Sequence, residues 1–144
     1  MQILEFFLPM KIPNVTNQMH RIRPAAKKGQ RAIVYDSPEL ADARQKFISY
    51  LAGHKPEEPL KGAVQLKVLF CYEPSGKHYH GEFKITKPDT DNLIKLFKDC
   101  MTKVGFWKDD AQVASEFVEK RYCNVPGIFV RVVEIVESGR TEEW

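Results

Sequence analysis

The chain has 144 residues, of which 43% are hydrophobic and 28% charged, and its formal net charge is +3 at pH 7. This composition is ordinary for a soluble globular protein, and no apolar run is long enough for a membrane-spanning helix. The opening MQILEFFLPMK has neither the basic leader nor the cleavage site of a signal peptide, so we expect one cytoplasmic domain, residues 1–144, without membrane contact.

The first predicted element is a short strand, ILEFFL, that stops at Pro9. A long loop or arm follows, about residues 11–35, with two prolines, two asparagines and no sustained apolar period in its first part. No acidic residue lies between Glu5 and Asp36, whereas six basic residues do: Lys11, Arg21, Arg23, Lys27, Lys28 and Arg31. A field of this sign favours a polyanion such as nucleic acid, although charge alone is equally consistent with a solvated basic loop.

A helix is predicted to begin at DSPEL, because Ser37 can cap it and Pro38 suits the first helical position. Apolar residues then recur at helical spacing, and Gly53 is placed to end the helix. The alternation along GAVQLKVLFCY predicts a strand with one buried face.

A turn-rich, basic loop containing Lys84 and Lys87 leads to a second predicted helix, from about Asp91 to Val104, which Gly105 can end. QVASEFVEKRYC and GIFVRVVEIV read as strands, joined by NVPG as a plausible hairpin turn, before a polar tail of about residues 137–144. This order predicts an α/β (α+β) domain, a mixed sheet of about four strands with two main helices packed on it.

Aspartate is concentrated in residues 87–110, which hold five of the seven aspartates and none of the twelve glutamates. On the predicted helix Asp91, Lys95 and Asp99 share one polar face, while the apolar stripe faces the core. Asp89 lies just before the helix, and Asp109 and Asp110 follow a short link after it.

Close carboxylates repel one another unless a cation or a shared proton joins them. Oxygen ligands favour a hard ion, Mg²⁺ or Mn²⁺, which can activate a water against a phosphate. The alternative is structural: Asp89 and Asp91 cap a helix, and Asp109 and Asp110 form a turn. From spacing alone the two interpretations are about equal.

Other patterns are weaker indications of a site. Three widely spaced cysteines show no disulfide or zinc pattern, so we expect Cys71, Cys100 and Cys123 to be reduced and at least half-buried. His78 and His80 lack a third ligand, and DTDNLIKLFKDC lacks the glycine and the final glutamate of a calcium loop.

The segment KPDTDNLIKLFKDCMTKVGFWKDDAQV resembles the signature of the RusA family of Holliday junction resolvases, small endonucleases common in phages and prophages. In that signature Asp-x-Asp-Asn opens a helix, a lysine and an aspartate follow on one face, and Gly-[aromatic]-x-x-Asp-Asp-x-Gln closes the site. The matching residues are Asp89, Asp91, Asn92, Lys95, Asp99, Asp109, Asp110 and Gln112. The segment IPNVTNQMHR is similar to the region after the first strand of the family, with Asn17 and Arg21 at plausible counterparts.

The resemblance implies a RusA-like fold, a homodimer and a Mg²⁺-dependent endonuclease that nicks four-way junctions symmetrically, with Mn²⁺ a plausible substitute. It implies Asp89, Asp91 and Asp110 as metal ligands, Lys95 at the scissile phosphate, and Asp109 and Asp99 as possible additions. We expect DNA contacts from Asn17, Arg21, Lys84, Lys87 and Asn92. A non-catalytic junction- or duplex-binding protein and a metal-dependent flap or branched-DNA nuclease remain alternatives.

Overall fold

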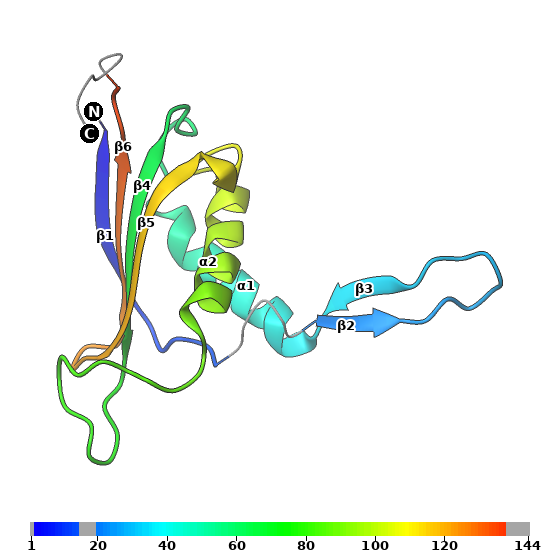
Figure 1. The fold of residues 1–144 in the computed structure, drawn as a ribbon, viewed down its shortest axis with the longest axis horizontal. Helices are drawn as coiled ribbons and strands as arrows, with labels where there is room; N and C mark the ends of the chain where they lie inside the picture. The colour runs from blue at the N-terminus through cyan, green and yellow to red at the C-terminus, as the bar shows by residue number, and fades with distance from the viewer. Residues whose placement is uncertain (1, 15–19, 138–144) are drawn as a thin grey trace, which may run out of the picture.

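Four strands form one mixed sheet in the order β1-β6-β4-β5 (Figure 1). They are β1 (Ile3–Pro9), β4 (Val64–Tyr72), β5 (Val113–Tyr122) and β6 (Gly127–Glu134). The computed structural model describes residues 2–14 and 20–137. The predicted fold class, a mixed sheet of four strands with two helices, is confirmed.

Both helices pack on the same face of this sheet (Figure 1). Helix α1 (Pro38–Ala52) begins as predicted, since the Ser37 hydroxyl accepts a hydrogen bond of 3.2 Å from the Leu40 amide. Helix α2 (Thr90–Val104) ends at Gly105, whose φ of 107° is a left-handed conformation that glycine adopts without strain.

The core lies between the sheet and the two helices. The Phe97 ring on α2 meets Phe47 of α1 at 5.4 Å and Phe70 of β4 at 5.7 Å, both edge to face. Phe106 and Trp107, which follow α2, are buried, and the three cysteines are buried and free, as expected. The apolar face of α2 is therefore fixed against β4, and its polar face is left to solvent.

The predicted hairpin between the last two strands is wrong. β6 pairs antiparallel with both β1 and β4, whereas β5 pairs parallel with β4, so β4 lies between β5 and β6. The short Cys123–Pro126 link crosses two strand spacings, about 10 Å. The backbone N–H and C=O groups on both edges of the buried strand β4 need hydrogen-bond partners. β5 supplies them on one side and β6 on the other, so the two later strands are not neighbours.

Part of the basic arm is also more ordered than predicted. Strands β2 (His20–Arg23) and β3 (Ile33–Asp36) pair antiparallel and form a β2–β3 hairpin that projects away from the sheet (Figure 1). Its apolar side chains are exposed: Ile22, Ile33, Val34 and Tyr35. Within the described residues, no helix is long and apolar enough to cross a membrane.

Candidate active site

The start of α2 carries the first pair of predicted carboxylates. Asp89 is the N-cap residue, yet its side chain makes no capping hydrogen bond, and Asp91 lies in the first helical turn. Both are exposed. The partial positive charge of the helix N-terminus favours carboxylates at this position, and the oxygens of Asp89 remain available to an external cation.

The other acidic pair follows α2, in the short 3-10 helix η1 (Asp110–Gln112). Asp109 caps this turn: its carboxylate accepts from the Ala111 amide at 2.8 Å, and the Gln112 side chain accepts from the Asp109 amide at 3.2 Å. The Asp110 side chain makes no hydrogen bond or ion pair within the described residues. The carboxylate of Asp110 is therefore available to a ligand, whereas that of Asp109 is already engaged.

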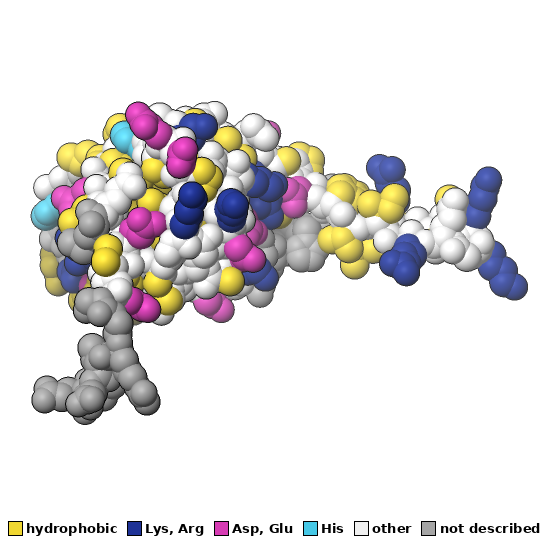
Figure 2. Space-filling model, turned by 90° about the horizontal axis from the view of Figure 1, so that it is seen from above, with side chains coloured by type: hydrophobic (Ala, Val, Ile, Leu, Met, Phe, Trp, Pro, Cys, Tyr) yellow, Lys and Arg dark blue, Asp and Glu magenta, His cyan; other side chains and the backbone are white. Residues whose placement is uncertain are grey.

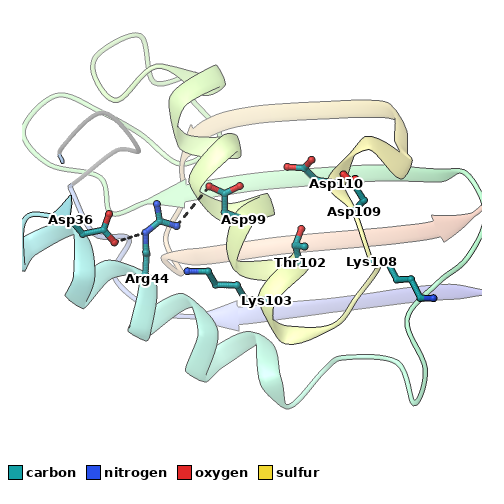
Figure 3. Close-up of a pocket in the computed structure, with 8 residues that line it drawn as sticks. All are labelled: Asp36, Arg44, Asp99, Thr102, Lys103, Lys108, Asp109 and Asp110. Carbon is teal, nitrogen blue, oxygen red and sulfur yellow. Dashed lines mark hydrogen bonds and ion pairs between the residues drawn. The ribbon is translucent and has the colours of Figure 1, made fainter. Parts of the chain in front are cut away.

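Asp109 and Asp110 line a pocket of about 480 Å³, here named the Asp110 pocket (Figure 3). Its other lining residues are Asp36, Arg44, Asp99, Thr102, Lys103 and Lys108. Figure 3 shows Arg44 of α1 between Asp36 and Asp99, with Nε 2.8 Å from Asp36 Oδ2 and Nη1 3.7 Å from Asp99 Oδ2. Asp99 is thus partly neutralised, and the pocket combines carboxylates with cations.

The two acidic pairs lie at opposite ends of α2. The Asp110 pocket is lined by Thr102 and Lys103 from the last turns of this 15-residue helix, whereas Asp89 and Asp91 lie at its start. At 1.5 Å per residue the helix is about 22 Å long. Among the described residues, no three His, Cys, Asp or Glu side chains are close enough to hold a metal ion. One chain therefore does not bring Asp89, Asp91 and Asp110 together.

The remaining face of α2 carries the predicted lysine. Lys95 is exposed one turn after Asp91, and its ammonium makes no ion pair with a described residue. Asn92 is half-buried beside it in the first turn. A lysine ammonium without an ion pair inside the protein can donate to a phosphate without giving up another partner.

The pre-helix loop, residues 73–88, places two further predicted residues near Asp89. The Lys84 ammonium lies 5.0 Å from the Tyr72 ring centroid and 2.6 Å from the Thr86 hydroxyl. Lys87 is exposed two residues before Asp89. This end of α2 is therefore bordered by cations, as a phosphate-binding surface requires.

A match to the family model of endodeoxyribonuclease RusA covers residues 13–133. The chain belongs to the RusA family. Over 65 residues it is 38% identical to the crossover junction endodeoxyribonuclease rusA of Lactococcus phage r1t, a stretch that covers 44% of this chain and 50% of the phage protein. The chain thus spans half the length of that relative.

A second relative covers more of the chain. The uncharacterized protein YqaN of Bacillus subtilis (strain 168) is 30% identical over 104 residues, which is 63% of this chain and 72% of that protein. The RusA model extends across α1, the pre-helix loop, α2 and β5, so it includes every predicted site residue.

In this RusA-family chain two predicted DNA contacts are not placed. Asn17 lies outside the described residues, and of Arg21 the structure describes the backbone alone, in β2. The rest of the hairpin carries Arg23, Lys27, Lys28 and Arg31, and Figure 2 shows Lys and Arg side chains along it and at its far end.

Two residues of the site were not predicted from the sequence. Arg44 of α1 neutralises Asp36 and Asp99, and Lys120 of β5 reaches the pre-helix loop. An arginine in an amphipathic helix and a lysine in a strand carry no sequence signal that distinguishes them from solvated charges.

Proposed function

We propose that this protein is a Mg²⁺-dependent, structure-selective endodeoxyribonuclease that resolves four-way DNA junctions by symmetric nicking. The observation that carries the proposal is the family match across the Asp-x-Asp-Asn and Asp-Asp-x-Gln segments. The phage relative, named a crossover junction endodeoxyribonuclease, supports the choice of substrate. The exposed carboxylates and lysines around α2 support the chemistry.

We assign the metal to Asp89, Asp91 and Asp110. The donor set fits a hard divalent cation, since it consists of carboxylate oxygens. The side chains of Asp89 and Asp110 make no helix-capping hydrogen bond, so their oxygens are available. Asp109 is less suited because its carboxylate already caps η1. Bound Mg²⁺, or Mn²⁺ in its place, supplies charge neutralisation and water activation.

The separation along α2 limits how such a site can form. An ion held by all three carboxylates requires Asp110 from a second protomer, or a large movement within one chain. We propose a homodimer in which each site combines Asp89 and Asp91 of one protomer with Asp110 of its partner. The absence of a three-carboxylate group among the described residues supports this arrangement.

The other residues bind and orient the DNA. Lys95 offsets charge on the scissile phosphate, at a point close to Asp91 on the same helix face. Lys84, Lys87 and Asn92 contact the backbone beside it. The β2–β3 hairpin, with Arg21 and the preceding Asn17, extends the basic surface along a DNA arm, and the lack of acidic residues between Glu5 and Asp36 supports this role.

Cleavage of three fixed substrates tests the proposal. A four-way junction, a flap and a plain duplex are incubated with the wild-type protein and with Asp91→Asn, with and without Mg²⁺. We expect the wild-type protein to nick the junction, and to do so only when Mg²⁺ is present. Asp91→Asn should bind the junction without cutting it, because one ligand charge is lost.

Each rival gives a different result in the same assay. A non-catalytic junction- or duplex-binding protein shifts the junction without any metal-dependent product. A flap or branched-DNA nuclease cuts the flap faster than the junction. Normal cleavage by Asp91→Asn would remove Asp91 from the metal site.

A further inference from the structure

The second half of the pre-helix loop is hydrogen-bonded to the edge strand β5. The Gly81 amide donates to the Tyr122 carbonyl at 2.7 Å, the Tyr122 amide to the Glu82 carbonyl at 2.8 Å, and the Lys84 amide to the Lys120 carbonyl at 3.0 Å. The loop thus adds a short stretch of backbone pairing to β5 before it turns into α2. The direction in which the chain enters Asp89 is set by β5.

Lys120 makes the closest contacts between this strand and the turn before α2. Lys120 is a half-buried residue, and its ammonium donates to the Thr86 carbonyl at 2.7 Å and to the Pro88 carbonyl at 2.6 Å. Hydrogen bonds from a charged donor are short and about twice as strong as neutral ones. Because Pro88 directly precedes Asp89, these two bonds hold the backbone from which the Asp89 side chain projects.

The ammonium of Lys120 has charged neighbours of both signs. Burial lowers its pKa, the neighbouring Lys84 lowers it further, and Asp89 opposes the change. Lys84 itself donates to the Thr86 hydroxyl at 2.6 Å. Two cations therefore converge on Thr86, and the nearby acid is Asp89.

We infer that Lys120 is a positioning residue, which holds residues 86–88 so that the Asp89 carboxylate stays uncapped and directed to the bound metal ion. This inference rests on the proposed function, because it takes Asp89 to be a metal ligand. An N-cap aspartate normally accepts a hydrogen bond from the second or third helical amide. Once the turn is loosened, Asp89 can adopt that arrangement and withdraw its oxygens from the ion.

The test compares Lys120→Met with Lys67→Met. Methionine keeps the apolar stem of Lys120 but cannot donate to the two carbonyls. Lys67 is the matched control, since it is an exposed lysine in β4 whose ammonium lies 5.1 Å from the Phe117 ring. Lys120→Gln replaces Lys120→Met if the latter does not fold.

We expect the Mg²⁺ concentration for half-maximal junction cleavage to rise about tenfold or more in Lys120→Met, the range for losing a partner that orients a ligand. Cleavage at saturating Mg²⁺ and junction affinity without metal should change little. A titration with Mn²⁺ alone, followed by electron paramagnetic resonance, should show weaker binding in Lys120→Met and wild-type binding in Lys67→Met.

Unchanged Mg²⁺ dependence and Mn²⁺ binding in Lys120→Met, beside an active wild-type protein, would overturn the positioning role and leave the proposed function intact. An equal loss in Lys67→Met would do the same. A wild-type protein that neither cuts the junction nor binds Mn²⁺ would overturn the proposed function and this inference together.

Discussion

The two acidic ends of α2 are built differently, although they belong to one sequence signature. At the far end Asp109 is held in a capping box, and Asp110 shares a pocket with Asp99 and with the cations of α1 and α2. At the near end Asp89 is an exposed N-cap without a capping bond, held through its backbone by β5. Side-chain contacts therefore stabilise the far end, whereas hydrogen bonds to the backbone of the preceding turn stabilise the near end.

β5 connects the two ends and keeps them apart. It begins directly after η1 and carries Lys120 near its other end, and the seven steps from Val113 to Lys120 span about 23 Å at 3.3 Å each. A strand paired with β4 over this length does not shorten. A metal site that uses both ends therefore requires either a second chain, as we propose, or a large movement within one chain. Three changes separate these two arrangements or the roles of the two ends, and the largest effect is expected for the first.

Mixing two inactive variants should restore cleavage. Asp91→Asn and Asp110→Asn each remove one carboxylate from every site of a homodimer. After subunit exchange, about half of the dimers in an equimolar mixture contain one protomer of each kind. In these dimers one site has both aspartates and the other has neither, so we expect single nicks in the junction without full resolution, measured on a junction labelled in each strand.

Lys67→Met mixed with Asp91→Asn provides the control for subunit exchange. Its Lys67→Met homodimers should resolve the junction, and its mixed dimers should add single nicks whether or not the sites are shared. If only this control mixture nicks DNA, while Asp91→Asn with Asp110→Asn does not, the three carboxylates act within one chain. The two ends of α2 would then have to approach each other on DNA binding.

The second prediction separates Asp109 from Asp110. Asp110→Asn should lower the single-turnover cleavage rate by more than about 100-fold, the upper range for loss of a residue that merely orients a metal ligand. Asp109→Asn should lower it less than about tenfold, because asparagine caps a helix as well as aspartate does. Urea denaturation should show both variants within about 0.5 kcal/mol of the wild-type free energy of unfolding. The opposite ranking of rates would move the metal ligand to Asp109.

The elements that hold the site were predictable where one face of an element meets the core. The apolar stripe of α2 and the glycine after it define the helix, and the alternation of β4 defines the central strand. The hairpin strands β2 and β3 were missed because their apolar residues are exposed, so no buried face imposes a period on them.

The arrangement of the site depended on features that lie outside local sequence patterns. The resemblance implies that Asp91 and Asp110 bind one metal ion, which within one chain requires the link after the helix to return to the helix start. Instead Phe106 and Trp107 are buried at the C-terminal end, and the Leu60 amide bonds to the Phe106 carbonyl at 2.8 Å, which keeps η1 there. Lys120 acts on backbone carbonyls more than 30 residues away, a contact that side-chain spacing does not predict.

The smallest effect is expected at Asp99, a third carboxylate of the Asp110 pocket. Its oxygen is 3.7 Å from Arg44, whereas Asp36 lies at 2.8 Å from the same guanidinium, so Arg44 keeps its closer partner when Asp99 is replaced. Asp99→Asn should therefore change the free energy of unfolding by less than about 1 kcal/mol, as for other partly exposed ion pairs. Cleavage should fall less than about tenfold, because the loss of the negative charge of Asp99 makes the field around Asp110 more positive.

Asp42→Asn is the matched variant for Asp99→Asn, because Asp42 is exposed on α1 and lines a different pocket. Both variants are measured by urea denaturation and by junction cleavage over a range of Mg²⁺ concentrations. If Asp99→Asn, and not Asp42→Asn, loses cleavage to the extent of Asp110→Asn, then Asp99 binds the ion as well. The far end of α2 would in that case contribute two carboxylates, and its pocket, rather than the exposed start of the helix, would determine the affinity for the metal.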